Sequence, residues 1–306
     1  MTNSVVVLGS INLDIVLHTD RLPKIGETIV GKGIDYLVGG KGSNQAVAIS
    51  RSGGDVALLG KIGADTFGDK ILSYLKEEKM DLSHLMIEPN FFTGIASIFK
   101  LPEDNCITVI SGANELVDNT FVDSVVDVIK EADILLMQLE IPVSTVKYAL
   151  RIAKQNGVTT VLNPAPFNSE ILDTLDYVDY ITPNEIEFEE LCNKTLDTEE
   201  VFFEEMVKWD REHSTKLIVT RGGAGVSFVE DGKVETIPAY PVEVVDTTGA
   251  GDTFNGVFVT SIARGMSLKE AVRFASVGAS MSTRSLGAQT GIPTFEEIET
   301  YIETNK

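Results

Sequence analysis

Short apolar runs that alternate with longer helix-like segments constrain the fold of this chain more than any other feature. Six runs are rich in apolar and β-branched residues and have the composition of strands, at residues 4–10, 55–63, 132–140, 158–165, 178–185 and 216–223. Several are almost wholly apolar, which is typical of strands buried on both faces of a sheet. Helical patterning lies between them, at residues 43–54, 69–80, 144–157 and 199–213. The alternation predicts an α/β fold with a parallel sheet between two layers of helices.

Two regions interrupt the alternation. Residues 27–40 and 92–112 read as strands joined by turns, with no helix between them. We expect them to form a small antiparallel lobe. Because no repeat, low-complexity tract or long linker separates the lobe from the rest, we predict one domain over residues 1–306. Its small β lobe is formed by about residues 15–40 and 92–112.

The C-terminal third has its own pattern. Residues 226–240 predict a hairpin across Asp231-Gly232, because Asp-Gly favours the tight turn of a two-residue loop. Two helices are expected at about 250–264 and 268–284, and a terminal helix is expected from Thr294.

The charge balance excludes some classes of partner. The chain has 46 acidic and 25 basic residues, a formal net charge of −21. A surface with this much negative charge repels nucleic acid and anionic membranes. An anionic substrate would have to be met locally, by backbone N–H groups or a cation. Cys106 and Cys192 are far apart and predict reduced thiols, and no signal peptide or membrane-length apolar run is present, so we expect a cytoplasmic protein.

Polar residues follow the predicted strands at their carboxyl ends, the edge where open parallel sheets bind ligands. They are Asn12, Asp14, Glu140, Asn163, Asn184 and Thr220. Each alone is also compatible with an ordinary cap or turn residue. Six at equivalent ends of one predicted sheet favour a binding site.

A glycine-rich stretch, GGKGSNQA, occupies residues 39–46. Its glycines allow close approach of a ligand to the backbone, and Lys41 and Asn44 supply donors. The alternative is a plain loop followed by a helix whose N-cap is Ser43. The stretch lacks the spacing of a Walker A loop, and no G-x-G-x-x-G follows a strand, which weakens a dinucleotide-binding interpretation.

A second stretch that contains glycines and other small residues, DTTGAGDTFNG, occupies residues 246–256. Small residues at a helix start leave N–H groups accessible, and the helix dipole adds positive charge there. Gly249, Ala250 and Gly251 therefore predict an anion hole without basic side chains. Asp252 would repel phosphate as a ligand but suits a base that takes a proton from an attacking hydroxyl. The alternative role for Asp252 is to complement the helix dipole.

These stretches resemble the ribokinase (PfkB) family of carbohydrate kinases, and the likeness extends over nearly the whole chain. Residues 246–254 resemble the family's C-terminal signature, and residues 39–46 resemble its N-terminal one. The motifs GSINLD, MQLE, NPAP and TPNE resemble the members that act on ribose. The resemblance implies a doubly wound α/β domain with a β-sheet lid. It also implies ATP-dependent phosphorylation of a sugar, D-ribose at O5, and a homodimer formed through the lid.

The resemblance also assigns residues to roles. It makes Asp252 the catalytic base, with an anion hole at Gly249, Ala250 and Gly251. The expected sugar-binding residues are Asn12, Asp14, Gly40, Lys41, Gly42, Asn44, Glu140 and Asp252. The expected ATP-binding residues are Asn184, Thr220, Arg221, Gly222, Gly223, Gly225, Gly251 and Ser276. Glu187 completes an N-x-x-E pattern that the family links to magnesium and phosphate.

Many family members bind a monovalent cation, potassium, beside the anion hole. The positions that match are Asp246, Thr248, Ser282, Ser285, Gly287 and Gly291. Gly291 stands where a serine is usual, so one cation ligand is missing or replaced. Ser276 stands beside the adenine position, where other members carry larger polar side chains, and this puts the strength of adenine stacking in doubt.

Alternatives of two kinds stay open. Within the same fold, the substrate is another small sugar, such as fructose or deoxyribose, or a nucleoside. Asp14 argues against a 2-deoxy sugar, because a carboxylate placed for two adjacent hydroxyls would be half satisfied. A nucleoside would need an apolar slot for its base, which the sequence does not locate. Outside enzymes, the alternative is a non-catalytic sugar-binding regulator, whose mark would be loss of the base or of the anion-hole glycines.

Overall fold

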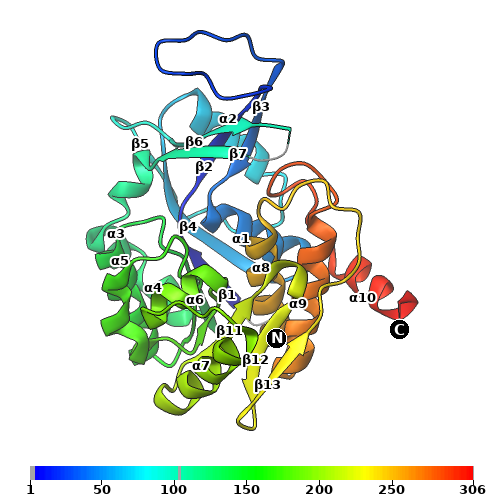
Figure 1. Ribbon diagram of the computed structural model, residues 1–306. Coiled ribbons are helices and arrows are strands. Elements are labelled where there is room, and N and C mark those ends of the chain that lie inside the picture. The colour runs from blue at the N-terminus through cyan, green and yellow to red at the C-terminus, as the bar shows by residue number, and fades with distance from the viewer. Residues whose placement is uncertain (1–3, 103–104, 306) are drawn as a thin grey trace.

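The computed structural model describes residues 4–102 and 105–305, and its larger sheet organises the molecule (Figure 1). Nine described strands form this sheet, in spatial order β13 (Lys233–Ile237), β12 (Val226–Glu230), β11 (Lys216–Thr220), β10 (Tyr180–Ile181), β9 (Thr159–Leu162), β8 (Ile134–Met137), β1 (Ser4–Leu8), β4 (Asp55–Gly63) and β5 (Leu85–Glu88). Neighbours from β11 to β5 run parallel, and β12 and β13 extend the edge as an antiparallel hairpin.

Central strand β1 shows why the sequence reads as an unbroken apolar run. Val6 and Leu8 face one core, whereas Val5 and Val7 face the core on the other side of the sheet. Side chains alternate between the two faces of a strand, so a strand covered on both faces is apolar at every position.

Helices cover both faces of this sheet (Figure 1). One face is covered by α3 (Asn119–Ser124), α4 (Val126–Glu131), α5 (Val143–Gln155), α6 (Glu185–Cys192) and α7 (Glu199–Glu212). The other is covered by α1 (Lys41–Arg51), α2 (Thr66–Leu75), α8 (Ala250–Ala263), α9 (Leu268–Ser282) and α10 (Phe295–Thr304). Short 3₁₀ helices occupy Gly112–Leu116, Ser169–Tyr177 and Gly222–Ala224. The predicted α/β fold, a doubly wound, mainly parallel sheet flanked by helices, is confirmed.

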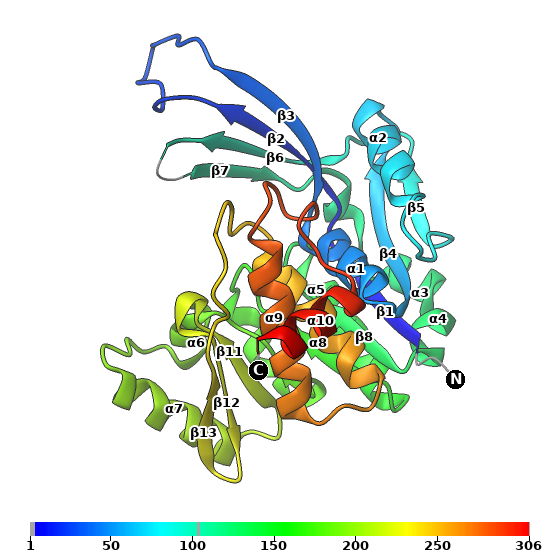
Figure 2. The same cartoon turned by 90° about the vertical axis from the view of Figure 1, so that its right-hand side faces the viewer.

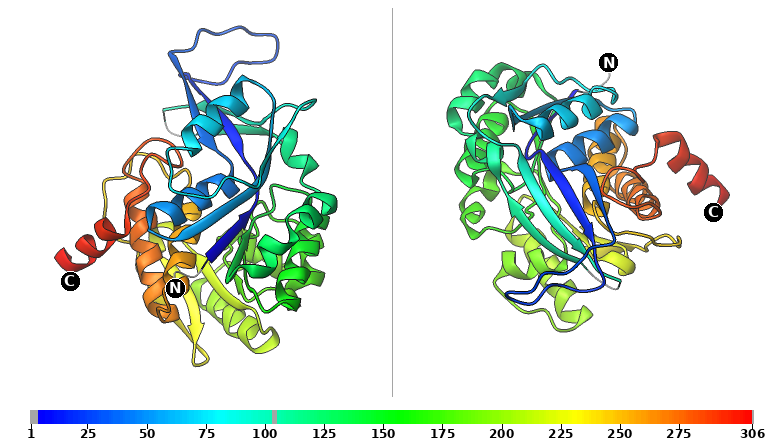
Figure 3. Two further views of the ribbon diagram at one scale, coloured as in Figure 1. Left: turned by 180° about the vertical axis from the view of Figure 1, so that it is seen from behind. Right: turned by 90° about the horizontal axis from the view of Figure 1, so that it is seen from above.

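A smaller sheet lies over the carboxyl-end edge of the larger one, as Figures 2 and 3 show. Its strands are β3 (Gly33–Gly39), β2 (Asn12–His18), β6 (Gly94–Lys100) and β7 (Asn105–Ile110), in that order. The expected purely antiparallel lobe is wrong, because β2 pairs parallel with β6. The chain passes from β1 almost directly into β2, which then occupies the centre of the lobe. Glu103 and Asp104, inside the predicted 92–112 segment, lie outside the described residues.

Several element boundaries differ from the predicted ones. Helix α1 begins at Lys41 after an N-cap at Gly40, so Ser43 lies inside the helix and is not its cap. The strand expected at 178–185 shortens to Tyr180–Ile181. Strand β5 and helices α3, α4 and α6 are additional to those predicted. The hairpin at Asp231-Gly232 is confirmed, with φ angles of 51° and 73° at its turn. No described helix has both the length and the apolar character that spanning a membrane requires.

Candidate active site

The site lies where the order of the sheet reverses. From β1 and β8, which are neighbours, successive strands of the chain are added in opposite directions. Such a switch point leaves a crevice outside the carboxyl ends of the strands. A cavity of about 690 Å³ opens to one side of it, at the carboxyl ends of β9, β10 and β11. Its wall combines the starts of α1 and α8 with polar residues that end β9, β10 and β11, namely Lys41, Gly249, Asp252, Asn163, Asn184 and Thr220.

The amino end of α8 forms one wall of the cavity. Gly249 is its N-cap, with φ 75° and ψ 4°, a left-handed conformation that favours glycine. A Cβ at this position would also lie 2.6 Å from the Cβ of Ala288, so space and backbone both require glycine. Gly249, Ala250 and Gly251, the predicted anion hole, line the cavity. The Ala250 N–H donates to the Thr247 carbonyl across 3.2 Å.

Asp252 lies in the first turn of α8 and is only 6% exposed. Its two carboxylate oxygens each accept a hydrogen bond from α1, the neighbouring helix. The Asn44 Nδ2 donates to one oxygen across 2.9 Å, and the Gln45 Nε2 donates to the other across 2.9 Å. The two glycine-rich stretches therefore meet, although they are more than 200 residues apart in sequence.

Lys41 lines the same cavity from the first residue of α1. Burial lowers the pKa of its ammonium, but the carboxylates of Asp252, Glu140 and Glu187 outweigh burial, and the net effect is a raised pKa. Lys41 is therefore a permanent cation among acids. Its backbone N–H donates to the Glu140 carboxylate across 3.1 Å, and the Ser10 hydroxyl donates to the same oxygen across 2.6 Å.

The predicted sugar-binding acids lie on the smaller sheet and on the loop after β8. Asn12 and Asp14 are buried on β2, and Asn12 accepts a hydrogen bond from the Asn114 amide across 2.8 Å. Burial raises the pKa of Asp14 to about 7, with further contributions from the negative charges of Glu140 and Asp252. The three carboxylates thus interact across the site.

Glycines bring the backbone close to this side of the site. Gly40 has φ 89°, and a Cβ there would lie 2.7 Å from the Asn12 backbone nitrogen. At Gly42 a Cβ would lie 2.6 Å from the Gly9 carbonyl carbon. Residues at both positions must therefore be glycine for α1 to start beside β2.

On the predicted nucleotide side, the cavity is lined by Asn184, Thr220, Gly222, Gly223, Gly225, Gly251 and Ser276. Arg221 is not among the lining residues. Its guanidinium donates to Glu185 and Glu199 across 3.1 and 3.0 Å and lies over the rings of Phe202 and Phe203. The Arg221 side chain therefore anchors the loop to α6 and α7.

Glu187 lines the cavity and forms a capping box with Asn184 at the start of α6. Burial raises the pKa of Glu187, although the Asn184 N–H and the Lys41 charge oppose this. A single carboxylate fits magnesium that arrives with nucleotide phosphates, because Mg²⁺ is commonly held by one or two carboxylates plus phosphate oxygens. Across residues 4–102 and 105–305, no group of three or more His, Cys, Asp or Glu side chains is placed to hold a metal.

The predicted cation-binding segments meet at Asp246. One carboxylate oxygen accepts from the Thr248 N–H and hydroxyl across 3.0 and 2.7 Å, and the other accepts from the Gly287 N–H across 2.9 Å. Burial acts to raise the pKa of Asp246, but these bonds outweigh it and the pKa is lowered. Ser285 lies half-buried in the loop between α9 and Gly287.

Gly291, the departure from the family pattern, packs against the Ser282 carbonyl. A Cβ at Gly291 would overlap the carbonyl oxygen and lie 2.9 Å from the carbonyl carbon. A serine therefore does not fit here in this conformation. Glycine lets the Ser282 carbonyl occupy the space that a side chain would take.

Several residues of the site were not predicted from the sequence. Gln45, Gln138 and Gln289 contact the site residues through their buried amides. Gln45 follows Asn44 in the glycine-rich stretch and Gln138 lies in the MQLE motif, which are usable signals, although no role was predicted for either residue.

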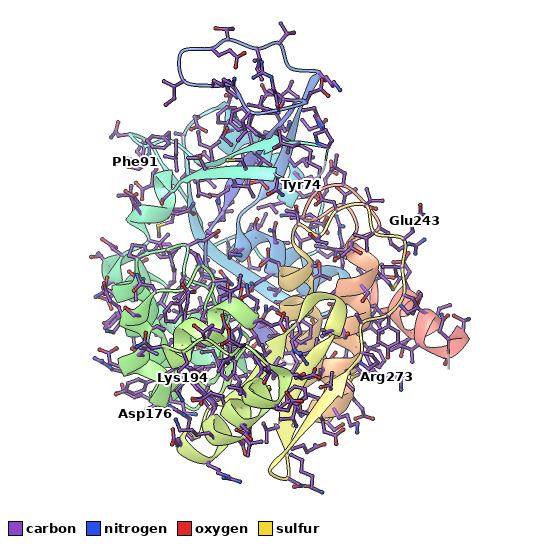
Figure 4. The ribbon with its side chains drawn as sticks, in the orientation of Figure 1. Tyr74, Phe91, Asp176, Lys194, Glu243 and Arg273 are labelled. Atoms are coloured by element: carbon purple, nitrogen blue, oxygen red, sulfur yellow. The ribbon has the colours of Figure 1, made fainter. Side chains whose placement is uncertain are left out.

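A second unpredicted part of the wall is the segment between β13 and α8, which contributes Ala239, Tyr240, Pro241, Val242 and Val244. Glu243, in this segment, is exposed at the surface in Figure 4. Arg273, on α9, donates to the Tyr240 hydroxyl across 3.1 Å and ties the segment to that helix (Figure 4).

Comparison with known proteins agrees with this geometry. The chain matches the model of the pfkB family carbohydrate kinases over residues 2–295. It is 39% identical to a ribokinase of Lactococcus lactis, covering 96% of this chain and 95% of that one. Identity to a ribokinase of Bacillus subtilis is 37%, with 97% and 98% covered. The fold is similar to that of an Arabidopsis thaliana ribokinase complexed with ribose and ATP, with TM-score 0.91, 30% identity and 99% of each chain covered. This protein belongs to the pfkB family of carbohydrate kinases.

Proposed function

We propose that the protein catalyses the ATP-dependent phosphorylation of D-ribose to ribose 5-phosphate. The single observation that carries the proposal is the buried Asp252 carboxylate, which lies in the first turn of α8 beside a helix amino end that faces the cavity. Asp252 takes the proton of the sugar hydroxyl while the oxygen of that hydroxyl forms a bond to the γ-phosphorus. The bond between that phosphorus and the β–γ bridging oxygen breaks, and ADP leaves.

The sugar lies between the smaller sheet and α1 in this proposal. Asp14 and Glu140 accept hydrogen bonds from its hydroxyl groups, and Asn12 and Asn44 supply further polar contacts. The backbone of Gly40, Lys41 and Gly42 passes close enough to contact it as well. A polyol needs many such partners, and the relatives named ribokinase support ribose as the sugar.

ATP lies on the other side of Asp252. Its phosphates meet the backbone of Gly249, Ala250 and Gly251, where the dipole of α8 favours negative charge. The Lys41 ammonium is a second source of positive charge. The remainder of the nucleotide lies along Asn184, Thr220, Ser276 and the loop 221–225, most of which line the cavity.

Two cations are part of the proposal. Magnesium would be held by Glu187 together with the phosphates, and it would neutralise phosphate charge near the acids of the site. Potassium would be held near Asp246 and Thr248, with carbonyl groups of Ser282, Ser285 and Gly287, and with Gly291 contributing no side chain. The charged carboxylate at Asp246 supports a cation at this place.

We also propose that the smaller sheet is a lid that excludes water during the reaction, and that two copies join through it. Strands β3 and β7 form its edges, and apolar side chains are exposed on both. A cytoplasmic location completes the proposal, since it is where a kinase meets ATP.

The decisive test is Asp252→Asn, assayed by ADP release with D-ribose, 2-deoxyribose, fructose and a nucleoside, each with potassium or sodium. The variant keeps the size of the side chain but cannot accept the proton. We expect turnover of ribose to fall about 10²–10⁴-fold while ribose and ATP still bind in calorimetric titrations. Wild-type turnover in the variant would exclude the proposed base, and preference of the native enzyme for another acceptor would exclude ribose.

A further inference from the structure

A buried set of amides surrounds the Asp252 carboxylate. Asn44 and Gln45 donate to its two oxygens, and each of these amides in turn accepts a hydrogen bond from a glutamine. The Gln138 Nε2 donates to the Gln45 Oε1 across 2.6 Å, and the Gln289 Nε2 donates to the Asn44 Oδ1 across 2.8 Å. All four amide side chains are 5% exposed or less. Asp252 therefore has two layers of amides around it.

Asp252 and the outer layer together determine which end of each inner amide faces the carboxylate. If the Gln45 amide turned by 180°, its oxygen would face the carboxylate and its nitrogen would face the Gln138 nitrogen. Both contacts would be repulsive, and a buried donor left without an acceptor is costly. Gln289 acts on Asn44 in the same way.

The outer glutamines use only their nitrogen ends for this purpose. Among the described residues, the Oε1 atoms of Gln138 and Gln289 are buried and have no hydrogen-bond partner. Gln138 is confined further by Gly9, where a Cβ would overlap its Oε1. The contacts of the outer glutamines with the inner amides are therefore made by their nitrogen ends.

Gln45 is the centre of the set. Its Nε2 also lies 3.2 Å from the Asn163 Oδ1, and the Asn163 Nδ2 donates to the Thr182 carbonyl across 3.0 Å. Gln45 thus connects Asp252 to the ends of β8, β9 and β10, the rigid edge of the larger sheet. A carboxylate on the first turn of a helix gains a fixed orientation from this connection.

We propose that Gln45 and Gln138 are positioning residues for phosphoryl transfer: they hold the Asp252 carboxylate in the one orientation that leaves it open to the sugar hydroxyl. The proposal rests on the proposed function, because it takes Asp252 as the base. The side-chain hydrogen bonds of these two glutamines join them to Asp252, to Asn163 and to each other, so we infer that each acts through Asp252.

Gln45→Met tests the inner layer, since methionine fills a similar volume without an N–H group. We expect kcat to fall about 10- to 100-fold with KM for ribose and ATP within about twofold, because the base is displaced while the binding groups stay in place. Gln155→Met, at the exposed end of α5, is the matched control and should leave both constants unchanged.

A comparison of Gln138→Glu with Gln138→Met tests the role of the outer layer. When ionised, the carboxylate introduced by Gln138→Glu can only accept, so it either repels the Gln45 oxygen or turns the Gln45 amide, and both outcomes disturb the contact with Asp252. We expect Gln138→Glu to lower kcat more than Gln138→Met. Protonation restores a donor, so the ratio of variant to native kcat should rise about tenfold between about pH 8.5 and 6. A role in filling space alone predicts no such pH dependence.

A double-variant cycle separates this proposal from the proposed function. In an Asp252→Asn background, Gln45→Met should cause little further loss, because the group that it positions is already absent. If Asp252→Asn abolishes turnover but the glutamine variants have native kcat, or if the two losses simply multiply, positioning is wrong and the base assignment stands. If Asp252→Asn keeps native turnover, both proposals fail. Thermal melting of every variant identifies loss of folding as distinct from loss of positioning.

Discussion

At Asp14 the requirements of ligand binding and of stability conflict. It is buried on β2 among other acids, and burial together with Glu140 and Asp252 raises its pKa to about 7. The folded protein therefore favours the neutral carboxyl, whereas a sugar hydroxyl is bound better by the charged form. In its proposed role the charged residue suits a sugar ligand, but its charge is unfavourable in the protein without ligand.

This leads to a prediction on pH and stability. Because the pKa of Asp14 is raised in the folded state, the contribution of Asp14 to the free energy of unfolding is complete below about pH 4. This contribution is lost as the pH rises through about 7. Asp14→Asn removes this loss, so we expect the variant to gain stability over the native protein at pH 8 and to gain less at pH 5. Urea unfolding at both pH values measures the difference.

Asp176→Asn, at the surface in Figure 4, is the control and should shift stability equally at the two pH values. An equal shift for Asp14→Asn would contradict the raised pKa. Weaker ribose binding by Asp14→Asn would accompany the gain in stability if Asp14 is part of the sugar site.

At the scale of elements, contact between α1 and α8 determines the geometry of the site. Gly256 of α8 lies directly against α1: a Cβ there would lie 2.8 Å from the Gln45 carbonyl oxygen and would overlap the Ala48 side chain. The two helices approach closely enough for Asn44 and Gln45 to reach Asp252 only because residue 256 has no side chain.

Gly256→Ala should therefore act on stability and on activity together. We expect a loss of about 1–3 kcal/mol from overpacking, measured by denaturant unfolding, and a lower kcat because α1 is displaced from Asp252. Gly33→Ala is the control, since its nearest neighbour, in the His18 ring, lies 3.8 Å from the added Cβ. Native stability in Gly256→Ala would show that the helices have room to separate.

Most elements, but not their pairing, could be predicted from the sequence. Runs such as Val5–Leu8 carry a local signal, because burial on both faces demands apolar residues at every position. Strand β2 was misassigned because its polar residues Asn12 and Asp14 look like the end of β1, and only the tertiary fold makes them central. Gln138 and Gln289 act across elements, through bonds to residues 93 and 245 positions away, so no spacing in the sequence reveals their partners.

At the scale of the whole molecule, the smaller sheet has an apolar surface that its own chain leaves open. Ile107 and Val109 on β7 are each 48% exposed. By register they lie on the same face as Ile98 and Ala96 of β6, which are buried. Exposed apolar edge strands invite pairing with another chain, which supports the proposed homodimer.

Substituting both residues with glutamate should prevent that association. We expect Ile107→Glu with Val109→Glu to sediment as a monomer in velocity ultracentrifugation, because a charged edge cannot be buried against its copy. The same double substitution at Ile186 and Val201, exposed on α6 and α7, is the control and should leave the dimer intact. A native protein that sediments as a monomer would exclude the homodimer.

The distance along the chain between Asp252 and its two partners on α1 has a consequence for synthesis. The hydrogen bond from Asn44 spans 208 residues, and a ribosome adds roughly 5–20 residues each second, so the partners are made about 10–40 s apart. No nascent chain that stops short of α8 contains both halves of the site. A product truncated before α8 lacks Asp252 and the amino end of that helix, so we expect it to transfer no phosphoryl group from the ATP of the cell.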